Sequence, residues 1–310
     1  MKTRRCGALR RWPAARMAAL ALALAAAGCT TAPVAPPAAA PPAVTPAALP
    51  LRIGLALGGG AARGFAHVGV IQVLEEAGIQ PDFIVGTSAG SLVAALYASG
   101  RSGAQLQQLA ETMEEAAFTD WTLPLLSARG MLRGEALARY VNGMVANRPI
   151  ETMPRPLGIV ATDLHSGNGV LFQRGSAGTA VRASSAVPAV FQPVAIAGRE
   201  YVDGGLVAPV PVRYAHQMGA NFVIAVDISA APEGNPTADT LQVLLQTFAI
   251  MGRSINSYEL RDADVVVRPG LAGVGSADFT SRRRSIEAGR VAMRQALPAL
   301  QAALAARAPH

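Results

Sequence analysis

"LALGGGAARGFAHVGV", residues 55–70, joins a strand-like apolar run to a helical pattern through three consecutive glycines. A strand that feeds a glycine cluster and then a helix presents unpaired backbone N–H groups, which favour a negatively charged partner. Strand-like and helix-like runs continue to alternate after this stretch. The alternation predicts an α/β fold of three layers, with helices on both faces of a central, mostly parallel sheet.

The alternating region begins at residue 51 and has no internal repeat. The expected strands are 52–57, 82–85, 157–162, 170–173, 192–196, 222–228 and 264–268. The expected helices are 61–77, 89–98, 103–117, 134–146, 179–186, 240–260 and 286–306. In a chain that is 51% hydrophobic, about 260 residues suffice for one large core. We therefore expect a single domain over residues 51–310.

Residues 1–28 have the layout of a signal peptide. They hold six basic residues and no acidic ones, and the apolar run 17–27 is too short to span a bilayer. Gly28 directly before Cys29 resembles a bacterial lipoprotein cleavage site, after which the cysteine is lipidated. Ala26 stands where such signals usually have Leu, so ordinary export with cleavage after a small residue is the alternative.

Residues 29–50 predict an extended tether, because after Cys29 they contain only Ala, Pro, Thr, Val and Leu and offer no periodic face to bury. Without the leader Cys29 is the single thiol, which excludes a disulfide framework. Thr30 rather than Asp follows it, so no inner-membrane retention signal is evident. The expected location is the bacterial cell envelope, on the periplasmic side of the outer membrane, through an N-terminal lipid anchor.

The net charge of +7 is misleading. The leader supplies six of the 27 basic residues and none of the 20 acidic ones, which leaves 21 basic against 20 acidic residues after residue 28. A balance of +1 removes the argument for a nucleic-acid partner.

The glycine loop fails both common nucleotide patterns. From Gly58, the sixth position of a dinucleotide fingerprint is Arg63 instead of glycine. From Gly59, a phosphate-binding P-loop needs Lys and Ser or Thr where Phe65 and Ala66 stand. Two interpretations remain open at this point: a tight turn without chemistry, and an oxyanion hole whose N–H groups stabilise a negative oxygen during attack on a carbonyl.

A candidate nucleophile follows in "PDFIVGTSAGSLVAALYASG", residues 81–100. The segment predicts a short strand, the pattern G-T-S-A-G and a helix, which is the context of a nucleophile elbow. Gly86 and Gly90 flank Ser88 at two residues on either side and give the strained turn room. The alternative is a glycine-rich turn with a capping serine.

A serine hydroxyl needs a base to accept its proton. The chain has four histidines, His67, His165, His216 and His310, and only His165, in a polar turn, merits consideration. Strand ends offer the carboxylates Asp163, Asp203 and Asp227. A carboxylate can serve as the base itself where burial raises its pKa. Asp203 stands out because Gly204 and Gly205 permit a sharp turn directly after it.

Together these motifs resemble the patatin-like phospholipase family, in which a glycine loop ending in Arg-Gly, a G-x-S-x-G serine and an Asp-Gly-Gly aspartate occur in that order. Here they read GGGAARG, GTSAG and DGG. The segment VRASSAVPAVFQPV, residues 181–194, and LVAPVPV after the aspartate also resemble bacterial members. The resemblance covers about residues 51–230 and implies the patatin-like α/β/α fold.

The resemblance further implies a Ser–Asp dyad that works without histidine, metal or cofactor. By position, Ser88 would be the nucleophile and Asp203 the base, with an oxyanion hole at Gly58, Gly59 and Gly60. Other motif residues would support the site, and these are Arg63, Gly64, Gly86, Gly90, Gly204 and Gly205. Whether Arg63 positions the loop or meets an anionic head group stays open.

The expected activity is that of a lipid acyl hydrolase of the phospholipase A or lysophospholipase type, acting on a phospholipid or another acyl ester. One alternative is a carboxylesterase or thioesterase that acts on soluble acyl esters. Another is a catalytically silent lipid-binding envelope protein. The apolar segment 118–134 is expected to be core beneath a loop, or else an acyl-chain or bilayer contact, and "SRRRS", residues 281–285, is expected to be a solvated helix start.

Overall fold

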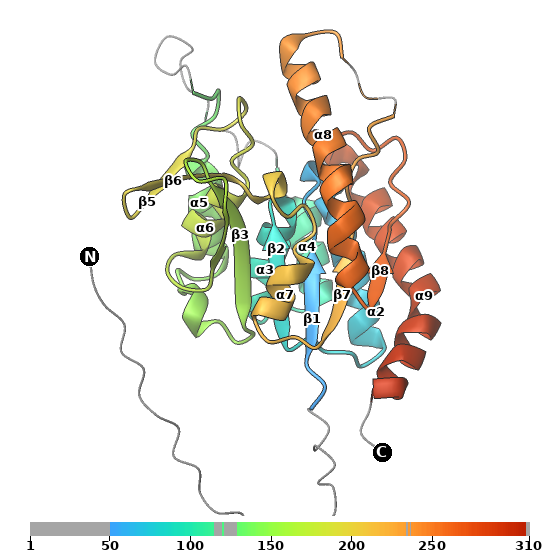
Figure 1. Ribbon diagram of the computed structural model, residues 1–310. Helices are drawn as coiled ribbons and strands as arrows, with labels where there is room; N and C mark the ends of the chain where they lie inside the picture. The colour runs from blue at the N-terminus through green and yellow to red at the C-terminus, as the bar shows by residue number, and fades with distance from the viewer. Residues whose placement is uncertain (1–49, 115–119, 121–128, 234, 236, 308–310) are drawn as a thin grey trace, which may run out of the picture. The chain divides into compact units, whose positions relative to one another are not determined.

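The computed structural model describes residues 50–114, 120, 129–233, 235 and 237–307. Residues Ala48–His310 form one compact unit, which Figure 1 shows as a central sheet with flanking helices. The expected signal peptide, Cys29 and the tether up to residue 49 lie outside the described residues. None of the described helices is both long enough and apolar enough to cross a bilayer.

The described residues form one sheet of eight strands in the order β5-β6-β3-β2-β1-β7-β8, with β4 paired to β3. The strands are β1 (Ile53–Leu57), β2 (Phe83–Thr87), β3 (Leu157–Asp163), β4 (Gly169–Phe172), β5 (Val194–Ile196), β6 (Arg199–Asp203), β7 (Phe222–Val226) and β8 (Val265–Val267). The five strands from β3 to β8 along the sheet run parallel. The pairs β3–β4, β3–β6 and β5–β6 are antiparallel. The predicted mostly parallel sheet is therefore confirmed.

The expected strand ranges omit β6, the strand that ends at Asp203, although Asp203 itself is expected at a strand end. A turn at Gly198 folds β6 back on β5 as a short hairpin. The stretch REYVD, residues 199–203, opens with two charged residues, and only its last three residues are buried. Its local pattern therefore does not separate a strand from a loop. The other seven strands lie where the sequence predicts them, with bounds shifted by a few residues.

The described α-helices are α2 (Ala66–Glu76), α3 (Ala89–Ala98), α4 (Gly103–Thr112), α5 (Glu135–Met144), α6 (Ala177–Ser184), α7 (Val212–Gln217), α8 (Thr240–Glu259) and α9 (Arg282–Arg307). Helix α3 has the predicted bounds. The first predicted helix is divided, because Ala61–Phe65 forms a 3-10 turn, η2, before α2 begins. Helix α7, after Pro211, is absent from the predicted set.

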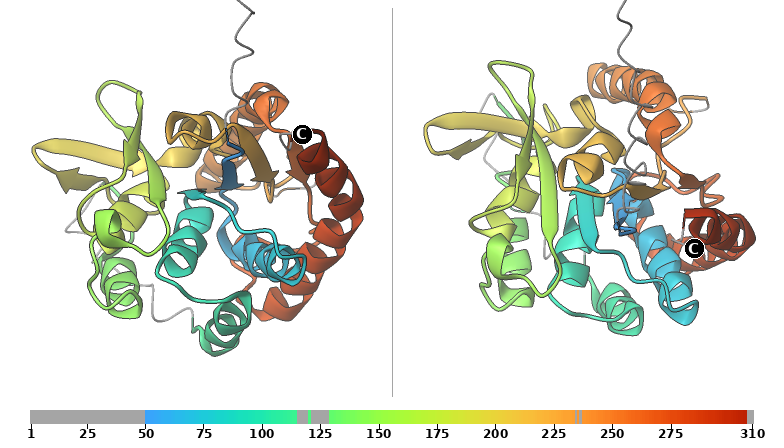
Figure 2. Two further views of the ribbon diagram at one scale, coloured as in Figure 1. Left: turned by 90° about the horizontal axis from the view of Figure 1, so that it is seen from below. Right: turned by 60° about the horizontal axis from the view of Figure 1, so that its bottom comes forward.

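The two faces of the sheet carry separate cores, because alternate residues of a strand point to opposite sides. Leu55 and Leu57 of β1 pack into the larger core with α2, α3 and α9. Ala56 between them packs into the smaller core, which contains Tyr214 of α7. Figure 2 shows helices on both sides of the sheet. These two cores make the molecule three-layered, as predicted.

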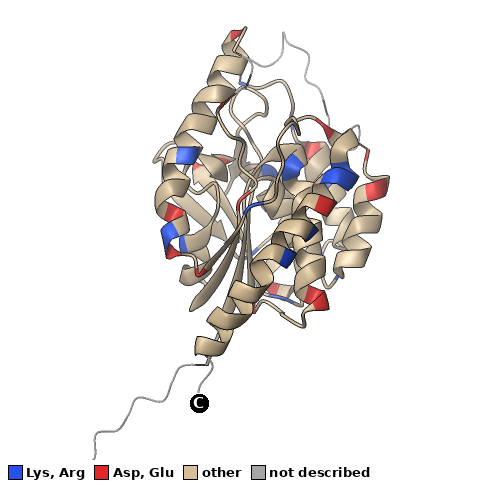
Figure 3. Ribbon diagram, turned by 90° about the vertical axis from the view of Figure 1, so that its right-hand side faces the viewer, with Lys and Arg blue, Asp and Glu red and all other residues tan. Residues whose placement is uncertain are grey.

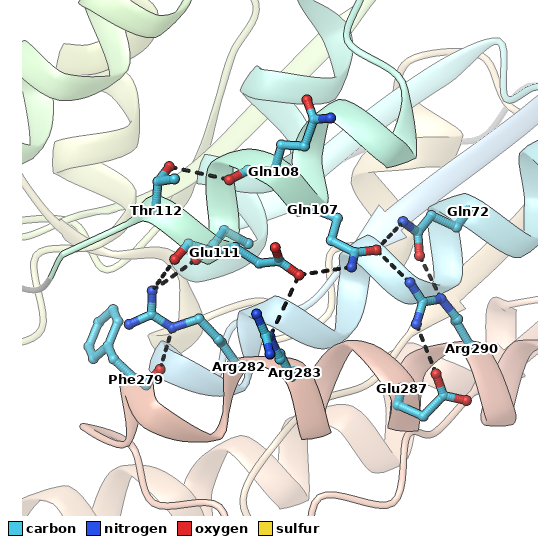
Figure 4. Close-up of polar contacts among 11 residues, drawn as sticks. Gln72, Gln107, Gln108, Glu111, Thr112, Phe279, Arg282, Arg283, Glu287 and Arg290 are labelled. Atoms are coloured by element: carbon cyan, nitrogen blue, oxygen red, sulfur yellow. Dashed lines mark hydrogen bonds and ion pairs between the residues drawn. The ribbon is translucent and has the colours of Figure 1, made fainter.

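Helix α9 starts one turn earlier than predicted, at Arg282 within "SRRRS". The Arg282 guanidinium donates to the Glu111 carbonyl (Figure 4) and also to the carbonyls of Ala110 and Met113. These groups lie at the carboxyl end of α4, where helix carbonyls lack partners. The neighbouring Arg283 lies 3.8 Å from a Glu111 carboxylate oxygen and is exposed. The basic run thus begins a helix, as predicted, but its first arginine also joins α9 to α4.

Candidate active site

Ser88 lies in a strained turn between β2 and α3. Its φ of 52° and ψ of −123° fall in a region that residues with a side chain rarely adopt. The turn is tight enough to exclude a Cβ on either side: one placed on Gly86 would lie 2.4 Å from the Gly90 carbonyl oxygen, and one on Gly90 would lie 2.2 Å from that of Leu57. This is the geometry of a nucleophile elbow, as the motif predicts.

Asp203 faces Ser88 across the sheet end. The Ser88 Oγ lies 2.7 Å from Asp203 Oδ2 and donates to it. The other carboxylate oxygen accepts the Gly205 N–H at 2.6 Å. The Asp203 backbone is held as well, because its N–H donates to the Ala186 carbonyl and its own carbonyl accepts the Thr162 hydroxyl. The structure thus brings together the two side chains that the motifs single out.

The environment of Asp203 suits a proton acceptor. Burial raises the pKa of its carboxyl to about 6, against the opposing effects of the Gly205 N–H and the Ser88 hydroxyl. A carboxylate with a pKa near 6 is ionised at neutral pH but is a far better base than a solvated aspartate.

A cavity of about 820 Å³ opens beside the pair, and both Ser88 and Asp203 line it. Most of its walls are apolar side chains, among them Leu92, Leu96, Leu106, Phe191, Leu245 and Phe248. A concave apolar site with a few polar groups is the usual form of a small-molecule site. Here the chemistry on offer is attack by a hydroxyl on a ligand that has a large apolar part.

The glycine loop differs from the prediction at its first two residues. The Gly58 N–H donates to the Val226 carbonyl at 3.0 Å, and the Gly59 N–H donates to the Pro209 carbonyl at 2.9 Å. Both groups are therefore engaged within the fold and are not free to bind an oxyanion. Gly59 still approaches the serine, since a Cβ built on it would lie 3.2 Å from Ser88 Cβ.

The next two N–H groups are better placed. Gly60 and Ala61 line the cavity and precede the first internal bond of η2, from the Arg63 N–H to the Gly60 carbonyl. Among the described residues neither N–H has a protein partner. Ala61 holds a φ of 51°, a strained value that turns this peptide. The structure therefore moves the candidate oxyanion hole from Gly58, Gly59 and Gly60 to Gly60 and Ala61.

His67 is not a base for Ser88. It is fully buried, and its Nε2 lies 2.8 Å from the Gly58 carbonyl oxygen. Burial lowers the His67 pKa to about 4, so the ring is neutral and Nε2–H donates to that carbonyl. With the Gly58 N–H also bonded, both backbone polar groups of Gly58 are fixed. His67 thus anchors the base of the glycine loop.

The other motif residues surround the same turn. Arg63 is half-buried and lines the cavity, and its Nε has no hydrogen-bond partner among the described residues. Burial lowers the Arg63 pKa, which the nearby Asp227 opposes. Gly64 packs against Ala89, and Gly204 lies so close to the Val160 carbonyl that a Cβ would be 2.2 Å from it.

The sequence missed Ser184, a fully buried residue of α6. Its hydroxyl accepts the Ser88 N–H at 2.8 Å and donates to the Val160 carbonyl. It therefore fixes the nucleophile's backbone and removes the Ser88 N–H from the oxyanion donors. Ser184 lies within "VRASSAVPAVFQPV", but nothing in that segment distinguishes it from the adjacent Ser185.

The remaining candidates lie elsewhere. His165 lines a separate small cavity with Asp163, Ser166 and Arg199, so it is not the base. His216 is held by the carbonyls of Ala220 and Asp262.

His310 lies outside the described residues, as do Trp121 and most of the apolar segment 118–134. Within that segment Leu132 is buried and lines the cavity. No three described His, Cys, Asp or Glu side chains group as a metal site.

A family model described as patatin-like phospholipase matches residues 55–216, which include the glycine loop, the elbow and Asp203. The chain belongs to the patatin-like phospholipase family. The family assignment made from the three motifs is therefore confirmed.

Relatives in the family include bacterial and mammalian proteins. An uncharacterised NTE family protein of Mycobacterium tuberculosis is 38% identical over 183 residues, which cover 59% of this chain and 50% of the relative. A second NTE family protein of the same organism is 30% identical over 270 residues, which cover 78% of this chain and 46% of the relative. The mouse patatin-like phospholipase domain-containing protein 6 is 32% identical over 228 residues, which cover 71% of this chain and 16% of the mouse protein. This patatin-like chain thus spans half or less of the length of these relatives.

Among solved structures, VipD from Legionella pneumophila superposes with a TM-score of 0.50 at 16% identity, covering 80% of this chain and 67% of VipD. At that identity the likeness concerns the fold alone. It agrees with the α/β arrangement of the patatin-like domain described above.

Proposed function

We propose that this patatin-like protein is a serine lipid acyl hydrolase that cleaves fatty-acyl esters of phospholipids or lysophospholipids. The observation that carries the proposal is the 2.7 Å hydrogen bond from Ser88 Oγ to Asp203 Oδ2 in the wall of an apolar cavity of about 820 Å³. Family membership supports the hydrolysis of lipid esters.

The proposed mechanism uses the chain's own groups. Asp203 accepts the Ser88 hydroxyl proton as Oγ attacks the ester carbonyl carbon. The negative oxygen that forms is stabilised by the N–H groups of Gly60 and Ala61. Asp203 then gives the proton to the leaving alcohol, which departs as the lysophospholipid or glycerophosphodiester and leaves an acyl–Ser88 ester. Water, deprotonated by Asp203, attacks that ester, and as the acyl–Oγ bond breaks Asp203 returns the proton to Ser88 Oγ and the fatty acid is released.

The cavity supports a long-chain substrate. Its apolar walls can enclose an acyl chain and exclude water from the developing charge. Arg63 supports a substrate with an anionic head group, because a half-buried guanidinium without a partner at Nε is stabilised by a nearby anion. Of the two roles left open for Arg63, we favour contact with the head group.

We also propose that the protein is held at the bacterial outer membrane by a lipid on Cys29. The support is the sequence of the leader and of the tether, residues 29–50. Metabolic labelling with a palmitate analogue tests this: wild type should take up label, Cys29→Ser should not, and label retained in Cys29→Ser would contradict it.

The hydrolase proposal is tested by mass spectrometry of the fatty acids released from phosphatidylcholine and lysophosphatidylcholine. Ser88→Ala should lose at least about 10⁴-fold in rate, while the control Ser257→Ala, an exposed serine on α8, should match wild type. Turnover retained by purified Ser88→Ala would contradict the assignment of the nucleophile.

Two further readouts separate the alternatives. A wild-type chain whose Ser88 stays unlabelled by a fluorophosphonate would be a silent lipid-binding protein. A chain with equal rates on short and long acyl esters, and no increase at lipid interfaces, would be a soluble-ester carboxylesterase or thioesterase.

A further inference from the structure

The first half of α8, Thr240–Gly252, has the sequence TLQVLLQTFAIMG and no charged residue. In Figure 1 this half stands above the carboxyl ends of the parallel strands. The nearest charged residues along the chain are Asp239 and Arg253, directly before and after this half, which has neither the blue nor the red of charged residues in Figure 3. An uncharged run of this length on a projecting helix is unusual for a surface in contact with water.

The inner face of this half-helix belongs to the cavity. Leu245, Phe248, Ala249 and Gly252 all line the space that contains Ser88. Gln246 holds the helix there, because its side-chain amide donates to the Pro232 carbonyl and accepts from the Asn235 amide. The inner face is therefore explained by the cavity, but it accounts for only one side of an uncharged helix.

The outer face is also apolar. Val243, Ile250 and Met251 are 50%, 54% and 47% exposed, and their spacing of seven and eight residues places them on one side of the helix. Four of the eight exposed large apolar side chains among the described residues lie between Val243 and Met251. The outer face of α8 is defined here as Val243, Thr247, Ile250 and Met251.

The one polar side chain of the outer face is already satisfied. The Thr247 hydroxyl donates to the Val243 carbonyl within the helix at 2.9 Å, so it needs no partner from water. A helix that is apolar on both sides is stable when its second side is covered by protein or by a membrane. No described residue covers the outer face, so its partner comes from outside the described chain.

We propose that the outer face of α8 docks onto the surface of a phospholipid bilayer. This inference rests on the proposed lipid hydrolase function and identifies where that site meets its substrate. The opposite side of the same half-helix lines the cavity with Leu245 and Phe248, and Leu245 is also 39% exposed. Docking of the outer face therefore brings the bilayer surface next to the helix that bounds the Ser88 cavity. Because the outer face has no charge, docking should not require anionic lipid and should resist salt.

The direct test places a tryptophan on the outer face in the full chain carrying Ser88→Ala. Ile250→Trp is compared with Val291→Trp, which replaces an exposed apolar residue of α9. Phosphatidylcholine vesicles with brominated acyl chains quench tryptophans that enter the bilayer. We expect the fluorescence loss of Ile250→Trp to exceed that of Val291→Trp at least about twofold, because docked apolar residues reach the acyl chains. Equal losses would overturn the proposal.

A second measurement covers the active protein. Val243→Ser/Ile250→Ser should lower the ratio of the rate on phosphatidylcholine vesicles to the rate on a monomeric short-chain ester about tenfold. The control Val291→Ser should keep the wild-type ratio. An unchanged ratio in the double variant would overturn the proposal. So would a blue shift of the Ile250→Trp emission that grows with protein concentration in the absence of vesicles, since that marks contact between two copies of the chain.

The two proposals fail in different ways. The quenching experiment uses a chain that lacks the Ser88 hydroxyl, so it reports docking whether or not the wild type hydrolyses lipids. Quenching at residue 250 without hydrolysis by wild type would contradict the hydrolase alone, and hydrolysis without quenching would contradict docking alone.

Discussion

Two aspartates at the ends of the paired strands β3 and β6 are both buried, yet they ionise very differently. Asp163 is 2% exposed and Asp203 is 7% exposed. The pKa of Asp163 is lowered to about 2, whereas that of Asp203 is raised to about 6. The two carboxylates differ both in how strongly desolvation acts on them and in the hydrogen-bond donors around them.

Desolvation is the largest cause of the raised pKa of Asp203, whereas hydrogen-bond donors are the largest causes of the lowered pKa of Asp163. Asp163 accepts the Ser166 N–H, the Arg199 guanidinium at 2.8 Å and the His165 N–H, and together these stabilise its ionised form. Among the described residues, the Asp203 carboxylate accepts from the Gly205 N–H and the Ser88 hydroxyl alone, and these two donors do not offset its burial. A carboxylate with few donors keeps its affinity for a proton, which a general base requires.

The largest expected effect separates the two aspartates by function. Asp203→Asn should lower ester hydrolysis about 10⁴-fold, because no group remains to accept the Ser88 proton. Asp163→Asn, the matched control, should leave the rate per folded molecule within about threefold of wild type, since Asp163 lies outside the Ser88 cavity. Initial rates on a soluble ester measure both. Equal losses in the two variants would remove the functional distinction.

A second prediction concerns stability, with opposite signs at the two sites. Because folding raises the pKa of Asp203, the stabilisation that this carboxyl contributes is fully present below pH 3.8 and is lost as the pH rises through about 6. The loss amounts to roughly 3 kcal/mol in free energy of unfolding. Asp203→Asn should therefore unfold at higher urea than wild type at pH 8. The lowered pKa of Asp163 stabilises the fold above its unfolded-state pKa, and this is lost as the pH falls toward about 2. Asp163→Asn should accordingly be less stable than wild type at pH 8, and the reverse order of the two variants would be inconsistent with these environments.

The smallest expected effect comes from Arg199. Its side chain is mostly exposed, so Arg199→Gln should cost at most about 1 kcal/mol in free energy of unfolding. The pKa of Asp163 should rise in this variant, as NMR titration of the carboxyl carbon would measure. The pH profile of hydrolysis should stay that of wild type, and a displaced profile would show that the two carboxylates are coupled.

The fold was largely predictable because its strands and helices have strong local patterns. The sequence predicts a strand at 82–85, which the structure shows as Phe83–Thr87, and it predicts the helix Ala89–Ala98 with its observed bounds, because an apolar run marks the strand and Gly100 closes the helix. Strand β6 and helix α7 are missing from the predicted set because their local patterns are weak: β6 opens with the exposed Arg199 and the half-buried Glu200, and α7 has only six residues. Their conformation depends on pairing with β3 and β5 and on packing against the sheet, which local patterns do not encode.

The candidate site, like the fold, has one part that local motifs predict and another part that depends on tertiary contacts. Ser88 and Asp203 were identified from local motifs, and the structure places them in contact. The engagement of the Gly58 N–H depends on Val226, and that of the Ser88 N–H on Ser184. These partners lie about a hundred residues or more away along the chain. Which backbone donors remain free for an oxyanion is therefore a property of tertiary structure, and the motif alone does not specify it.

The central claim, that Asp203 activates Ser88, is tested most directly by the pH dependence of fluorophosphonate labelling at Ser88, followed by intact-mass spectrometry. Wild type should label faster as the pH rises, with a midpoint near pH 6, where Asp203 ionises. Asp203→Asn should label slowly and without that midpoint. A wild-type rate that does not change around pH 6, or the same midpoint in Asp203→Asn, would contradict the account.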